Sequence, residues 1–94
     1  MTDQNFQQQL AEHRKEIDLC DKQIIEALAK RMEVVEKVGV LKKQHNVPPL
    51  DPSRWQQVVE TRKAMAQQLG LKPELVGAIW EIFHQYALEL EAKV

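Results

Sequence analysis

The chain has 94 residues, of which 44% are apolar, with three Gly, four Pro and a single Cys. Its 13 Lys and Arg nearly balance its 14 Asp and Glu, which excludes the strong basic field of a typical nucleic-acid-binding protein. No apolar run approaches the roughly 20 residues that a membrane span needs, and the first residues lack the apolar segment of a signal peptide. We therefore expect one all-α domain over residues 1–94, cytoplasmic, in which Cys20 stays reduced.

The first predicted helix is unusually long. No proline interrupts the chain before Pro48, so we expect a helix from about Asn5 to about His45. Such a helix would be roughly 60 Å long, whereas a compact domain of this size is about 26 Å across. Much of its apolar stripe would then stay uncovered. We predict an interlocked homodimer in which a second copy covers that stripe.

Two shorter helices are predicted after the proline-containing link "HNVPPLDPS". Asp51 followed by Pro52 is typical of a helix N-terminus, and Gly70 suits the C-terminal cap of the same helix. A third helix is expected from about Pro73 towards the end of the chain. The predicted inner faces are Trp55, Val58, Val59, Arg62, Met65, Ala66 and Leu69 in the second helix, and Leu75, Val76, Ile79, Phe83, Ala87 and Leu90 in the third.

Three cations lie on the stripe that the long helix is expected to bury. In alternating steps of three and four residues the stripe reads Arg14, Ile17, Asp21, Ile24, Leu28, Arg31, Val35, Val38 and Lys42. Burying an unpaired charge costs several kcal/mol, and a single Asp cannot neutralise three cations. Arginine binds carboxylates through two parallel hydrogen bonds, so a small dicarboxylate is a suitable partner.

The spacing of these cations suggests how such a ligand would be held. Arg31 and Lys42 are separated by roughly 16 Å along the helix axis, so that both can reach one small molecule. Arg14 lies roughly 25 Å from Arg31 and could join that ligand only from an antiparallel partner helix. Two sites per dimer follow from this geometry. The alternative is that each cation packs its stem beside the stripe and keeps its charged head in water.

The segments "RKEIDLCDKQIIEALAKRMEVVEKVGVLKKQ" and "LDPSR" resemble the first helix and the start of the second helix of the AroQ-type chorismate mutases. The resemblance covers nearly the whole chain. It implies an all-α, interlocked homodimer that needs no cofactor and no metal. It also implies the rearrangement of chorismate to prephenate, on the route to phenylalanine and tyrosine.

The resemblance also implies roles for the three cations. Arg31 and the partner subunit's Arg14 would clamp the two carboxylates of chorismate. Lys42 would reach a carboxylate and the ether oxygen of the bond that breaks. A clamp of this kind holds a flexible molecule in its reactive conformation, and the ammonium stabilises negative charge that develops on the ether oxygen.

Further site residues follow from the same resemblance. Asp51 would lie near the ring hydroxyl of the substrate, with Arg54 in support. Glu91 would donate a hydrogen bond to the ether oxygen, for which its carboxyl must carry a proton. We therefore predict better activity in mildly acidic buffer, and the alternative for Glu91 is a solvated charge near the end of the third helix.

Three positions depart from the family pattern. Trp55 stands where the family usually has a Glu that accepts a hydrogen bond from the ring hydroxyl, and an indole cannot accept. Its simplest interpretation is a core aromatic of the second helix, and the loss of the acceptor would alter ring recognition. Ala87 stands where a small hydroxyl residue is common. His84 replaces an aliphatic residue, and we expect it beside the site or on its rim rather than as a metal ligand.

Other functions remain compatible with the sequence. Isochorismate-pyruvate lyases and aminodeoxychorismate mutases share the fold and the cationic clamp, and product identity would separate them from a chorismate mutase. A non-catalytic helical dimer, binding a dicarboxylate without turnover, is an alternative of another class. Asp51 and Arg54 favour the mutase over the lyase.

Overall fold

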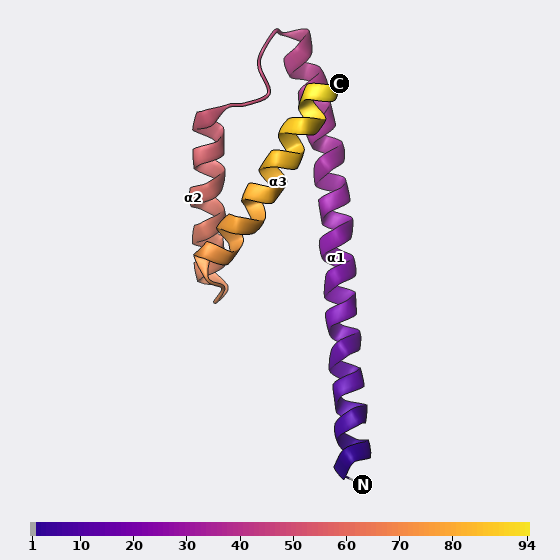
Figure 1. Ribbon diagram of the computed structural model, residues 1–94. Coiled ribbons are helices and arrows are strands. Elements are labelled where there is room, and N and C mark those ends of the chain that lie inside the picture. Colours follow the sequence, from indigo (N-terminus) through magenta and orange to yellow (C-terminus); the bar gives the residue numbers. More distant parts are fainter. Residues whose placement is uncertain (1) are drawn as a thin grey trace. The chain divides into compact units, whose positions relative to one another are not determined.

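The computed structural model describes residues 2–94, with side chains from residue 3 onward, and contains three α-helices (Figure 1). They are α1 (Thr2–Gln44), α2 (Pro52–Gln68) and α3 (Pro73–Lys93), with no strand among these residues. The predicted all-α class is confirmed. The chain divides into two compact units, Met1–Arg31 and Met32–Val94, which are described separately below. None of the described helices is sufficiently long and apolar to span a bilayer.

Helix α1 begins earlier than predicted, at Thr2 instead of Asn5. The polar run "QNFQQQ" continues the helix because glutamine is among the better helix formers. Asp3 lies in the first turn, where a negative charge interacts favourably with the helix dipole. A glutamine-rich end therefore extends this helix instead of ending it.

The C-terminus of α1 is closed by its own backbone. Asn46 adopts the left-handed conformation, with a φ of 57°, and its N–H donates to the carbonyl of Lys43 at 3.2 Å. The N–H of Val47 donates to the carbonyl of Lys42 at 2.8 Å. These two bonds form a Schellman motif, which satisfies carbonyls left free at the end of the helix. The last turn of α1 is thereby held in place.

Both ends of α2 follow the sequence prediction. Asp51 is the N-cap, and its Oδ1 accepts a hydrogen bond from the backbone N–H of Arg54 at 3.1 Å. At the other end Gly70 has a φ of 77°, a conformation that glycine adopts without strain. The N–H of Leu71 then donates to the carbonyl of Ala66 at 2.8 Å. This closure repeats the one at the end of α1 and sends the chain into α3.

The core of the unit Met32–Val94 lies where α2 packs on α3 (Figure 1). Its buried apolar side chains are Val58 and Ala66 of α2 and Val76 and Ala87 of α3, each no more than 8% exposed. All four are small, so the two helices approach each other closely. Their burial confirms the predicted inner faces at these positions.

Other positions of the predicted inner faces are exposed in the single chain. Met65 is 54% exposed, Leu69 76% and Leu75 51%. All three lie near the turn that joins α2 to α3, where neither helix covers them. Helical periodicity identified the apolar face of each helix, but the prediction that these three residues pack inward is wrong for the chain alone.

The described part of the unit Met1–Arg31 is the segment of α1 from Thr2 to Arg31, and it has no core of its own. None of its described side chains, residues 3–31, is buried. Several large apolar residues are more than half exposed, among them Phe6 (59%), Ile17 (57%), Ile24 (59%) and Ile25 (65%). An isolated helix gains little stability from propensity alone, and most helical stability comes from packing of an apolar face. This segment therefore carries an apolar face that its own unit leaves uncovered.

Candidate active site

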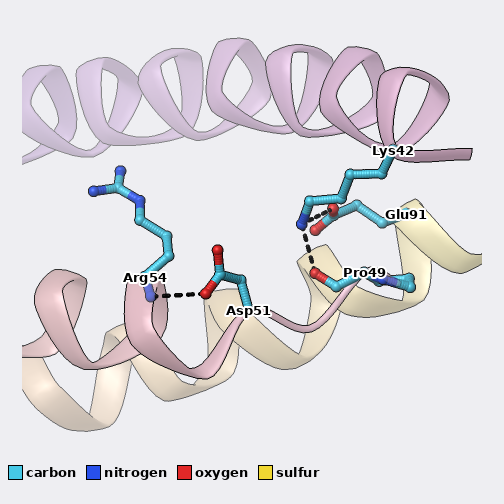
Figure 2. A network of polar contacts seen from close by, with 5 residues as sticks. All are labelled: Lys42, Pro49, Asp51, Arg54 and Glu91. Atoms are coloured by element: carbon cyan, nitrogen blue, oxygen red, sulfur yellow. Dashed lines mark hydrogen bonds and ion pairs between the residues drawn. The ribbon is translucent and has the colours of Figure 1, made fainter. Parts of the chain in front are cut away.

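Lys42 and Glu91 form a partly buried ion pair between α1 and α3 (Figure 2). The Nζ of Lys42 lies 2.8 Å from Oε1 of Glu91, and the two side chains are 22% and 9% exposed. The same Nζ donates a hydrogen bond to the carbonyl oxygen of Pro49 at 2.5 Å. The ammonium of Lys42 is therefore held between a carboxylate and a backbone carbonyl.

Gly39 allows α3 to approach α1 closely enough for this ion pair. A Cβ atom at Gly39 would lie 2.8 Å from the Cα of Glu91 and 2.8 Å from Cγ2 of Val94. Real Cβ atoms do not approach a backbone atom so closely, hence only glycine fits without a shift of α3. Gly39 is one turn before Lys42 on α1, so the contact between the helices places Glu91 within reach of the ammonium.

Replacing Gly39 by Ala is expected to push the last turn of α3 away from α1. Overpacking of this kind typically costs about 1–3 kcal/mol, which equals or exceeds the gain of about 1 kcal/mol in helix propensity. We expect a lower melting temperature together with a loss of activity, because the Lys42–Glu91 pair is disturbed. Thermal unfolding followed by circular dichroism and steady-state kinetics measure the two effects.

Gly77→Ala is the matched control for Gly39→Ala. A Cβ at Gly77 would meet only the flexible end of Lys63, at 2.8 Å from Cε, and that side chain can move aside. The control should unfold at the wild-type temperature or above it, since alanine is the better helix former. An equal loss of stability in both variants would contradict the close contact at Gly39.

Asp51 and Arg54 lie at the start of α2 (Figure 2). The carboxylate of Asp51 caps the helix through Oδ1, and the guanidinium of Arg54 donates from Nη1 to Oε1 of Gln57 at 2.7 Å. Both side chains are exposed. Both belong to the same unit as Lys42 and Glu91, and their roles toward a substrate stay predictions.

Arg14 and Arg31 belong to the other unit, Met1–Arg31. Arg14 is exposed and Arg31 is half-buried. The structure describes each unit separately, so it does not bring these cations together with Lys42. Their function as a carboxylate clamp remains a prediction.

Trp55 and His84 form a contact that sequence reasoning missed. The indole of Trp55 on α2 stacks on the imidazole of His84 on α3, with ring centroids 3.8 Å apart and planes 9° from parallel. Both residues are half-buried. We expected Trp55 in the core and His84 beside the site, without pairing them. The available signal was that both positions depart from the family pattern and lie on helices that pack together.

The side chains assembled here can hold an anion and donate hydrogen bonds to it. Lys42 supplies a positive charge, and Glu91, when protonated, supplies an O–H donor. Among the described residues, no group of three or more His, Cys, Asp and Glu is placed to hold a metal ion. A reaction that needs only binding, orientation and charge stabilisation suits this set of groups.

The fold and the site define a small all-helical protein with a cation and a carboxyl placed for anion chemistry. Residues 13–92 match the family described as chorismate mutase type II, and the chain belongs to this family of isomerases. Over 79 residues it is 35% identical to a T-protein of Haemophilus influenzae. These aligned residues make up 84% of this chain and 21% of that protein.

A second T-protein, from Enterobacter agglomerans, is 36% identical over 63 residues, which is 67% of this chain and 17% of that protein. The chain thus spans about a fifth of the length of these relatives. The resemblance to chorismate mutases seen in the sequence is confirmed at the level of the family.

Proposed function

We propose that the chain catalyses the rearrangement of chorismate to prephenate, on the route to phenylalanine and tyrosine. Membership of the chorismate mutase family supports this function. The observation that carries the proposal is the Lys42–Glu91 pair, 2.8 Å apart and largely shielded from water, with Pro49 as a third contact. These two side chains are the groups expected at the ether oxygen of the breaking bond.

The proposed reaction requires the protein to orient the substrate and to stabilise developing charge. In a Claisen rearrangement one C–O bond breaks while one C–C bond forms within the same molecule, and no group leaves. Holding the substrate in its reactive conformation removes an entropic barrier. Because Lys42 is already held by Pro49 and Glu91, its charge needs no reorganisation when negative charge develops on the ether oxygen.

We further propose that the active form is a homodimer, in which the partner subunit's Arg14 completes each site. The uncovered apolar face of Met1–Arg31, with Ile17 and Ile24 more than half exposed, supports a second copy as its cover. Arg31 would then bind the second carboxylate of the substrate. Light scattering that reports a monomer under assay conditions would contradict this assembly.

The Glu91→Gln variant tests the role of the carboxyl as a hydrogen-bond donor. A glutamine amide donates at every pH, whereas a carboxyl donates only when protonated. Wild-type kcat is therefore expected to rise as the buffer becomes mildly acidic, and Glu91→Gln is expected to lose that dependence. Measuring kcat of the wild type and of Glu91→Gln from acidic to neutral buffer tests this expectation.

The neighbouring glutamate serves as the control for this variant. Glu89→Gln removes the same charge from an exposed position of α3 and should keep the wild-type pH profile. If Glu91→Gln also keeps that profile, then the carboxyl does not donate to the substrate.

Incubation of the purified protein with chorismate, and separately with isochorismate, tests the reaction itself. Products resolved by NMR identify the activity directly. Prephenate from chorismate is the expected result. Salicylate and pyruvate from isochorismate would instead establish a lyase with the same clamp. If neither substrate is consumed, the proposed function is wrong, and an aminodeoxychorismate mutase or a non-catalytic helical dimer is left.

A further inference from the structure

The Trp55–His84 stack lies in the unit Met32–Val94. Neither residue belongs to the buried core or to the Lys42–Glu91 ion pair. Its rings lie nearly parallel, 9° apart, at 3.8 Å between centroids, so one face of each ring covers the other. Both residues are only half-buried, and part of the pair therefore remains accessible. A flat, apolar surface with a polar edge is available at the α2–α3 interface.

The stack lies on the same side of α3 as the carboxyl of Glu91. His84 precedes Glu91 by two helical turns, so the two side chains are about 20° apart around the helix axis and about 10 Å apart along it. Trp55 follows Asp51 by one turn of α2. The backbone N–H of Trp55 donates to the backbone carbonyl of Asp51 at 2.9 Å. The pair therefore lies one turn of α2 beyond Asp51 and two turns of α3 before Glu91, in the unit that also holds the Lys42–Glu91 contact.

The imidazole of His84 has hydrogen-bonding capacity to spare. A neutral imidazole has one donor nitrogen and one acceptor nitrogen, whereas the indole of Trp55 can only donate. Among the described residues, none forms a hydrogen bond with the ring of His84, whose contact is the stack. An acceptor nitrogen in a half-buried position is therefore available to a ligand hydroxyl.

We propose, on the basis of the chorismate mutase function proposed above, that the Trp55–His84 pair is the specificity-determining wall of the site. The hydroxyl on the ring of chorismate donates a hydrogen bond to the unprotonated nitrogen of His84, and the substrate ring lies against the stack. Trp55 acts as a positioning residue, because its indole holds the plane of the imidazole.

Kinetics with two substrates test this wall. His84→Phe keeps an aromatic ring that can stack on Trp55 but removes the acceptor nitrogen. We expect kcat/KM for chorismate to fall about tenfold or more, the effect of leaving a ligand hydroxyl without its partner. For chorismate that lacks the ring hydroxyl, the same variant should stay within about twofold of wild type, since no hydrogen bond is lost.

Two further results would overturn the proposal. If His84→Phe lowers kcat/KM equally for both substrates, the residue is merely structural. If it leaves chorismate turnover unchanged, His84 does not contact the hydroxyl. His84→Gln, which keeps an acceptor, should retain more of the discrimination between the two substrates than His84→Phe does. Far-UV circular dichroism shows whether each variant is folded.

Fluorescence separates a failure of this proposal from a failure of the proposed function. The chain has two tryptophans, so Trp80→Phe leaves Trp55 as the sole tryptophan, whose emission can be excited separately from that of Tyr86. Prephenate, which carries the same ring hydroxyl, should change the emission of Trp55 in this variant. A change in emission without turnover would support the wall and reject the catalytic function. Turnover of chorismate without a change in emission would support the function and reject the wall.

Discussion

Replacing Lys42 by Gln is expected to lower the rate of chorismate turnover by about 10²–10³-fold, the usual cost of removing a preorganised group that stabilises developing charge. Glutamine keeps a hydrogen-bond donor of similar reach but removes the positive charge. The loss should appear in kcat as well as in kcat/KM, because the charge acts most strongly in the transition state. The rate of prephenate formation at saturating chorismate gives kcat, and the rate at low chorismate gives kcat/KM.

Lys43→Gln provides the control for this variant. Lys43 is the next residue on α1, is exposed and forms no ion pair with Glu91, so its replacement should leave kcat nearly unchanged. Lys42→Gln also deprives Glu91, which is 9% exposed, of its ion partner, and a lower melting temperature is expected. Rates must therefore be compared at a temperature where circular dichroism shows both variants folded. A Lys42→Gln variant with the turnover of Lys43→Gln would contradict the proposed site.

Mixing two inactive variants is expected to restore activity if each site is shared between two chains. Arg14→Gln and Lys42→Gln should each be nearly inactive alone. In a mixed dimer, one site receives an intact Lys42 from its own chain and an intact Arg14 from the partner. Random re-association of equal amounts should recover about a quarter of wild-type activity, since half of the dimers are mixed and each has one intact site.

The outcome of this mixing experiment separates two arrangements. If Arg14 served the site of its own chain, then every site in a mixed dimer would carry a substitution and the mixture would stay inactive. Unfolding and refolding the two chains together ensures exchange, and refolding each variant alone is the control. Gain of activity only in the joint sample identifies a site built from two chains.

The bounds of α2 could be predicted because their signals are local. Asp51 and Pro52 define the start of α2, and Gly70 its end, through backbone chemistry that a few neighbouring residues determine. Which part of the protein covers an apolar face, by contrast, depends on residues far away in the sequence. Leu69 lies on the apolar stripe of α2 and is 76% exposed in the single chain, a property that no periodicity in the sequence reveals.

The contacts of the candidate site depended on information from far along the chain. Lys42 and Glu91 lie on different helices, and only the resemblance to a family placed them near each other. The stack of Trp55 on His84 was not predicted, because each residue was considered on its own helix. Helical phase gives the direction of a side chain, but the packing of α2 on α3 decides which residue it meets.

The closure of the chain after α1 has a consequence for the chain entropy that is lost when the site forms. The Schellman motif at Asn46 and the bond from the Lys42 side chain to Pro49 both span only a few residues, so little loop entropy is lost when they form. The contact between Lys42 and Glu91 instead closes a loop that contains about half of the chain, and this costs more entropy. The bond from Lys42 to Pro49 therefore orients the ammonium at a smaller loss of chain entropy than the contact with Glu91 requires. Lengthening the link between Asn46 and Pro49 is therefore expected to weaken the bond from Lys42 to Pro49 while leaving all three helices intact.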